Sequence, residues 1–139
     1  MTLLSRIEHH MQSAYLYEID EKCWREVVAE PTGKQVIRAA KIFYEKGLNP
    51  PVNKTKILFS CGRELILEPE YRVALKKESS FFASLFSKEE VFMERVSYTQ
   101  FQALLKALFE DAPMDWLDGL MLADYLELPS LFYRAFHCL

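Results

Sequence analysis

Hydrophobic residues recur at three- and four-residue spacing along much of the first 50 positions, which is the pattern of amphipathic helices. Residues 2–18 predict one such helix, whose apolar side carries Leu4, Ile7 and Met11. An apolar stripe of this kind needs an apolar partner surface. We expect these three side chains to pack against the rest of the chain or, as the alternative, against a second protomer.

Two shorter helices are predicted to follow. Residues 20–29 form the first, with Asp20 as its N-cap, because a short acidic side chain can accept hydrogen bonds from the free amides of a helix start. Residues 34–46 form the second, and Gly47 stands in the position of a left-handed C-cap. Residues 1–50 are therefore predicted to be a helical N-terminal segment.

The pattern changes after two consecutive prolines. Residues 56–60 and 64–68 are short apolar runs separated by a loop that contains Gly62, which predicts a β-hairpin. Residues 90–96 predict a third strand. Since a long segment with helical periodicity separates this strand from the hairpin, we expect a small sheet built from strands that are not all consecutive.

Apolar residues return to helical spacing in the other parts of this region, at residues 69–87, 98–109, 113–124 and 129–137. Ser97 stands where an N-cap is expected, and Pro113 and Pro129 each suit the first position of a helix. Residues 55–139 are therefore predicted to form an α+β domain in which helices surround a short sheet.

Composition narrows the class of protein. The 139 residues are 50% hydrophobic and 27% charged, which is too apolar for a disordered chain and suits one domain with its own core. No apolar run approaches the roughly 18 residues that a membrane-spanning helix needs. Arg6 and Glu8 interrupt the apolar stretch at the N-terminus, so we expect neither a signal peptide nor a membrane partner.

Charge is unevenly placed along the chain. The formal net charge is -3 at pH 7, whereas nucleic-acid-binding proteins normally carry a clustered basic surface, so no nucleic-acid partner is expected. No basic residue stands between Lys106 and Arg134, and that stretch holds six acids: Glu110, Asp111, Asp115, Asp118, Asp124 and Glu127. Such a stretch is either a solvated face or a surface that attracts a basic partner.

Residues that carry catalytic or metal chemistry are few and scattered. The cysteines Cys23, Cys61 and Cys138 are far apart and odd in number, which indicates free thiols in the reducing cytoplasm or nucleus. The segment 31–35 lacks the upstream glycine and the Ser/Thr of a phosphate-binding loop. No nucleophile has a base and an acid at a recognisable spacing. We therefore expect no enzyme activity and no catalytic, cofactor-binding or metal-binding residues.

One stretch after the predicted hairpin has a particular order of apolar residues around a serine, namely Tyr71, Leu75, Ser79, Phe82 and Phe86. BTB domains carry a pattern like H-x-x-x-L-x-x-x-S-x-x-F-x-x-x-F at this point, with histidine where tyrosine stands here. Residues 96–105 look like the family's entry from strand into helix, and residues 122–131 look like its closing A-D-x-L-x-φ-P-x-L stretch. Residues 56–136 thus resemble the BTB/POZ family, whose fold Skp and elongin C share.

The resemblance implies a short three-stranded sheet flanked by a cluster of helices, and a function in protein–protein interaction. In the family, cullins dock on the end of the motif helix, on the loop after it and on the following helix. The residues of this chain in the matching stretches are Phe86, Glu89, Tyr98, Phe109 and Glu110. In dimeric members an N-terminal helix packs across the partner, which would be the second-protomer role of Leu4, Ile7 and Met11.

The chain differs from the family pattern in places, so three hypotheses about its function remain. The loop at residues 87–89 is short and lacks the hydrophobic-x-acid motif of cullin-binding members, so cullin binding is expected to be weak. The leading hypothesis is a cullin-type ubiquitin-ligase adaptor, and the alternative is a homodimerisation or assembly domain without a ligase role. A third alternative is a ligand-binding or enzymatic domain in which residues 1–50 close a pocket.

Overall fold

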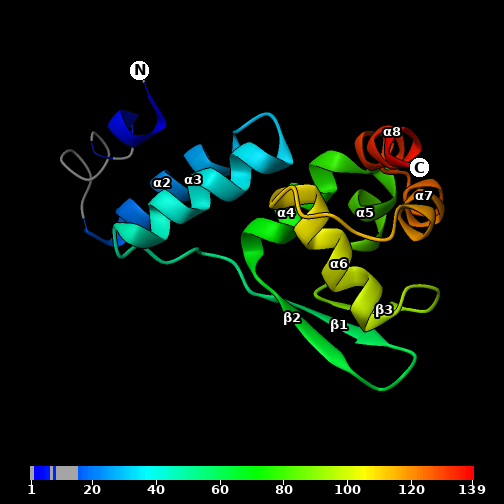
Figure 1. The fold of residues 1–139 in the computed structure, drawn as a ribbon. Helices are drawn as coiled ribbons and strands as arrows, with labels where there is room; N and C mark the ends of the chain where they lie inside the picture. Colours follow the sequence, from blue (N-terminus) through cyan, green and yellow to red (C-terminus); the bar gives the residue numbers. More distant parts are fainter. Residues whose placement is uncertain (1, 7, 9–15) are drawn as a thin grey trace.

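The structure is a computed structural model that describes residues 2–6, residue 8 and residues 16–139 (Figure 1). Within them, helices and a small sheet make the mixed α+β fold that the sequence predicts. The elements follow in the order α2 (Leu16–Val28), α3 (Gly33–Glu45), β1 (Thr55–Phe59), β2 (Glu64–Leu67), α4 (Pro69–Glu78), α5 (Ser80–Leu85), β3 (Glu90–Met93), α6 (Tyr98–Phe109), α7 (Trp116–Tyr125) and α8 (Pro129–Cys138). Figure 1 shows the α2–α3 pair and the α7–α8 pair on opposite sides of the molecule.

The first described residues are helical at positions 3–6 and 8. Ile7 and Met11, two of the side chains predicted to pack there, lie outside the described residues. Leu4 is 40% exposed, whereas its neighbour Leu3 packs against the core that α2 and α3 form. Leu4 is thus not buried within the chain, and its contact with a second protomer stays a prediction.

α2 begins before the predicted helix start, and this overturns the predicted cap. Asp20 lies inside the helix, so its assignment as an N-cap is wrong. The Asp20 carboxylate instead accepts a hydrogen bond from the backbone N–H of Asn49 at 3.3 Å, which fastens the segment after α3 to α2. The prediction for the end of α3 is confirmed, because Gly47 has φ +77° and follows the C-cap residue Lys46.

The sheet has the strand order β2-β1-β3. β1 pairs with β2 as the predicted antiparallel hairpin, and Gly62 supplies φ +90° in the turn between them. β3 lies parallel to β1 and ends at Met93, three residues before the predicted end. Alternate strand residues therefore face the helices, with Ile57 and Val91 buried, while Phe92 on the outer face is 57% exposed.

The motif residues that follow the hairpin form the centre of the sheet core. Leu75, Phe82 and Phe86 are completely buried, and the rings of the two phenylalanines stack with centroids 5.2 Å apart. Ser79 caps α5 by accepting a hydrogen bond from the N–H of Phe82 at 3.3 Å. Its hydroxyl donates to the carbonyl of Leu126 at 2.5 Å and so connects α5 to the segment between α7 and α8.

A second core, the N-terminal core, lies between α2, α3 and α4. Trp24 and Phe43 meet edge to face there, with ring centroids 5.2 Å apart. α4 separates the two cores, because Ala74 is buried in the N-terminal core and the adjacent Leu75 is buried in the sheet core. The N-terminal helices are therefore packed directly on the part of the chain that resembles a BTB domain.

The C-terminal helices begin at different kinds of residue. Pro129 is the first residue of α8, as predicted. Pro113 is not the first residue of α7, so that prediction is wrong. The carboxylate of Asp115 accepts hydrogen bonds from the N–H groups of Leu117 and Asp118 at 3.1 and 3.4 Å, and this cap sets the start of α7 at Trp116.

Candidate protein-interaction surface

The residues predicted to contact a cullin differ in exposure and belong to several elements. Phe86 is completely buried against Phe82, so its assignment to a partner interface is wrong, because the side chain that follows the motif helix turns into the core. Tyr98 is half-buried at the start of α6, with the Arg63 guanidinium 4.4 Å from its ring centroid. Phe109 is half-buried at the other end of α6 and packs on the ring of Tyr71.

The two acids of the predicted cullin site are exposed but lie apart. Glu89 precedes β3, and its carboxylate accepts a hydrogen bond from the Asn53 amide at 3.3 Å. Glu110 is the C-cap residue of α6. Glu110 follows Tyr98 by 12 positions along α6, which at about 1.5 Å per residue is about 18 Å. A partner that contacted all of these positions would have to cover the length of this helix.

The structure instead gathers exposed apolar side chains on the two C-terminal helices. We call this the α7–α8 apolar surface, and its members are Leu117, Met121, Tyr125, Phe132, Tyr133, Phe136 and Leu139. Met121 is 65% exposed and Tyr133 is 68% exposed. Exposed large apolar side chains on two neighbouring helices are typical of a surface that a partner covers.

Helical spacing explains why these side chains gather. Leu117 and Met121 recur four residues apart on α7, and so do Phe132 and Phe136 on α8. Adjacent faces of the same helices, with residues such as Leu122 in α7 and Leu131 in α8, are buried in the sheet core. Each helix is therefore apolar on the face that packs inward and on part of the face that meets water.

Acidic residues accompany this surface. Asp124 and Glu127 are exposed beside Tyr125, and Asp115 and Asp118 lie at the start of α7. The stretch from Lys106 to Arg134 contains no other basic residue. One cation approaches from elsewhere in the chain, since the Arg95 guanidinium lies 5.6 Å from the centroid of the Tyr125 ring. The surface is thus apolar with a predominantly acidic edge.

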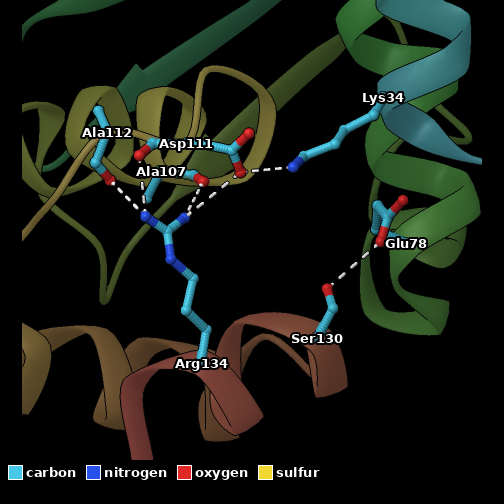
Figure 2. A network of polar contacts seen from close by, with 7 residues as sticks. All are labelled: Lys34, Glu78, Ala107, Asp111, Ala112, Ser130 and Arg134. Atoms are coloured by element: carbon cyan, nitrogen blue, oxygen red, sulfur yellow. Dashed lines mark hydrogen bonds and ion pairs between the residues drawn. The ribbon is translucent and has the colours of Figure 1, made fainter. Parts of the chain in front are cut away.

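Arg134 of α8 reaches the residues at the end of α6 and joins the two helices (Figure 2). Its guanidinium donates to the carbonyls of Ala107 at 2.6 Å, Asp111 at 2.9 Å and Ala112 at 3.2 Å. It also lies 4.8 Å from the centroid of the Trp116 ring. Arg134 therefore satisfies carbonyls left free at the end of α6 and holds α7 and α8 in place.

The same network reaches the N-terminal helices. Lys34 of α3 forms a hydrogen-bonded ion pair with Asp111, and this contact lowers the pKa of the Asp111 carboxyl below its usual range. Glu78 of α4 accepts a hydrogen bond from the N–H of Gly33 at 2.9 Å and another from the Ser130 hydroxyl at 3.5 Å. The amide of Gly33 at the start of α3, where a phosphate-binding loop would hold its anion, is thus occupied by a carboxylate of the chain itself.

Between α3 and α4, a buried carboxyl meets a tyrosine hydroxyl. Glu70 is buried, and Tyr44 donates its hydroxyl to the Glu70 carboxylate at 2.7 Å. Burial raises the pKa of Glu70 because the charged form loses its hydration, although the hydrogen bond from Tyr44 works in the opposite direction. Burial and the hydrogen bond to Glu70 raise the pKa of Tyr44.

This pair predicts a pH dependence of stability. Because the folded pKa of Glu70 is raised, its contribution to stability is fully present below the unfolded pKa and is lost as pH rises through the folded pKa. Glu70→Gln cannot ionise and should not show that loss. The free energy of unfolding of both proteins is measured with urea at about pH 4 and about pH 7. Relative to wild type, the variant should be more stable at about pH 7 than at about pH 4. Glu90→Gln, at an exposed strand position, is the control, and an equal gain in that variant would contradict the role of Glu70.

Comparisons with protein-family models, with curated proteins and with solved structures found no match to this chain. No helix in the described part of the chain is long and apolar enough to cross a membrane. Within the same residues, His, Cys, Asp and Glu side chains form no group of three or more that could hold a metal ion. The geometry of the α7–α8 apolar surface is therefore the strongest pointer to function.

The sequence contained a signal for this surface that the motif comparison did not use. Residues 129–139 include three aromatic side chains (Phe132, Tyr133 and Phe136) besides the buried Leu131 and Ala135, more than one buried face of a single short helix can hold. An excess of apolar residues over the inward positions of a helix indicates a second contact surface.

Proposed function

We propose that this protein is a protein–protein interaction module of the BTB/POZ kind, and that a partner docks on the α7–α8 apolar surface. The observation that carries the proposal is the exposure of large apolar side chains on both helices, with Tyr133 68% and Phe136 61% exposed. Covering them would remove apolar area from water, which is the main driving force of association. Aromatic side chains of this size are also the residues that most often dominate binding energy.

The arrangement of the sheet supports the BTB/POZ part of the proposal. The hairpin of β1 and β2, the parallel β3 beside β1 and the buried motif residues agree with the plan that the resemblance implies. The buried hydrogen bond from Ser79 to Leu126 gives the serine of the motif a structural reason, because it joins α5 to the C-terminal helices.

Charge at the surface favours a different protein over a second copy of this one. Two copies that met through α7 and α8 would bring Asp124 and Glu127 of both chains toward one interface, and like charges across an interface are costly. A partner helix with an apolar stripe flanked by Lys and Arg would complement the surface. Its association would be fast at low ionic strength and slower as salt screens the charges.

The proposal predicts that two substitutions on α8 strongly weaken partner binding. Purified wild-type protein should be monomeric by size-exclusion chromatography with light scattering, and it should retain a partner from an extract of its source cells. Tyr133→Ser/Phe136→Ser should weaken that complex at least about tenfold, because both side chains would lose their contact area. The thermal stability of the double variant should stay near that of wild type, since both side chains are exposed.

A matched control removes exposed apolar area elsewhere. Ile66 and Phe92 are 51% and 57% exposed on the outer face of the sheet, and Ile66→Ser/Phe92→Ser should leave the complex intact. Loss of binding in this control together with retention in the α8 variant would contradict the proposed surface. A wild-type dimer that the α8 variant converts to a monomer would instead favour the homodimerisation function.

Cullin binding is the remaining alternative, and it makes a different prediction. The exposed edge of Tyr98 and the carboxylate of Glu110 would then carry the contact, without help from the buried Phe86. Titration with purified cullin N-terminal domains separates the two sites. Binding that Tyr98→Ala and Glu110→Lys abolish, and that the α8 double variant leaves unchanged, would place the partner on α6.

A further inference from the structure

A groove lies on the side of the N-terminal core where α2 faces α4. Its volume is about 640 Å³, and its apolar wall includes Trp24 and Val28 of α2, Val52 of the segment before β1 and Val73 of α4. Clefts of roughly 300–1,000 Å³ with mainly apolar walls are the usual size and character of small-molecule sites. The groove needs both parts of the chain, since α2 and α4 each supply one wall.

Three cations accompany the apolar wall, namely Arg25, Arg72 and Lys76, and none of the described residues that line the groove is acidic. Arg72 is fixed in place, because its Nε donates to the carbonyl of Phe86 at 3.1 Å and its Nη2 donates to the same oxygen. Arg25 pairs with Glu21 through one nitrogen at 3.2 Å. Lys76 is exposed on α4.

This charge arrangement differs from that of the molecule as a whole. The chain has a formal net charge of -3, yet the lining of this groove within the described part of the chain carries three positive charges and no negative one. A carboxylate or phosphate at the rim could pair with any of these three cations. The guanidinium groups of Arg25 and Arg72 each have further N–H groups that can donate to it. An apolar body attached to that anion would lie on the wall that includes Trp24 and Val28.

We propose that the α2–α4 groove binds a small amphiphilic anion, with an apolar chain against Trp24 and Val28 and an anionic head at Lys76, Arg25 and Arg72. This site is separate from the α7–α8 apolar surface, so ligand binding in the groove does not depend on the proposed partner. The ligand class is a medium-chain carboxylate, which combines one negative charge with an unbranched apolar chain.

The indole of Trp24 supplies the readout. The second tryptophan is replaced by Trp116→Phe, so that fluorescence reports on Trp24 alone, and this background is used for every measurement. Decanoate should give a saturable change in the fluorescence of Trp24, because its chain would displace water from beside the indole. Decyltrimethylammonium, with the same chain and the opposite charge, should bind at least about tenfold more weakly, as should acetate, which has the head without the chain.

Two adjacent lysines give a matched pair of variants. Lys76 lines the groove and Lys77 does not, although both are exposed near the end of α4. Lys76→Glu should weaken decanoate binding at least about tenfold, whereas Lys77→Glu should leave it within about twofold of the background protein. Val52→Asp, at a 50% exposed position of the wall, should also weaken binding without unfolding the chain.

Three results would overturn the proposal. The first is the absence of a saturable change in Trp24 fluorescence with decanoate, and the second is equal binding of decanoate and decyltrimethylammonium. The third is an equal effect of Lys76→Glu and Lys77→Glu, which would show that only the overall charge matters. An acidic apolar peptide that binds the groove when decanoate does not would assign the site to a protein partner and would equally reject the small ligand.

Discussion

Replacing Phe82 by alanine should lower the free energy of unfolding by about 3–5 kcal/mol, the cost of removing a large aromatic side chain from a packed core. Phe82 is completely buried, and its ring stacks on Phe86 and meets Phe101 edge to face, with centroids 5.2 and 6.3 Å away. Its backbone N–H also donates to the cap residue Ser79. The substitution therefore opens a cavity where α5 and α6 meet.

Chemical unfolding followed by circular dichroism measures this loss, with Phe92→Ala as the control. Phe92 has the same side chain at a 57% exposed position, so its removal should cost well under half as much as that of Phe82. Equal losses for the two variants would mean that position 82 does not lie in the core. The BTB-like plan of α4 and α5 would then be wrong as well, because it depends on the burial of this residue.

Local patterns were sufficient for most of the fold. The hairpin, the capped helix α6 and the left-handed glycine after α3 follow from turn and cap chemistry, which acts over a few neighbouring residues. The start of α7 could not be predicted from the sequence, because proline at 113 and aspartate at 115 both suit a helix start. The choice between them was made by the two hydrogen bonds that the Asp115 carboxylate accepts.

The candidate surface was harder to predict because it depends on which of two apolar faces turns inward. Phe86 and Phe136 are both aromatic residues on or beside short helices, yet one is completely buried and the other is 61% exposed. The difference arises from tertiary packing, since Phe82 and Ser79 fix the direction of α5 while α8 is held from its other side by Arg134. Residue spacing alone does not contain this information.

The groove depends even more on tertiary structure. Trp24 and Lys76 are separated by about 50 positions in the sequence and come together only because α2, α3 and α4 pack around the N-terminal core. Its cations are unremarkable in the sequence, where basic and acidic residues alternate along this region. The alternative in which residues 1–50 help to close a pocket was the only sequence-based hypothesis that pointed toward this site.

Gly33→Val should destabilise the chain by about 1–3 kcal/mol through overpacking where α3 meets α4 and α6. A Cβ atom at position 33 would lie 2.8 Å from the Glu78 carboxylate, 2.9 Å from the Phe109 ring and 3.0 Å from the backbone carbonyl of Ala74. The first two groups can rotate away, but the carbonyl belongs to α4 and cannot. The start of α3 would therefore have to move away from α4.

The smaller substitution Gly33→Ala tests this packing most directly, through the sign of its effect on the free energy of unfolding. In a helix interior, alanine is more favourable than glycine by about 0.5–1 kcal/mol, so at this first helical position alanine without close neighbours should not destabilise the chain. Close packing predicts the opposite, with alanine destabilising and valine destabilising further. Lys34→Ala, which removes only the exposed ion pair with Asp111, should lower the free energy of unfolding much less than Gly33→Val does. Stabilisation by alanine, measured by chemical unfolding with tryptophan fluorescence as the probe, would show that the N-terminal helices are not packed tightly on α4 and α6.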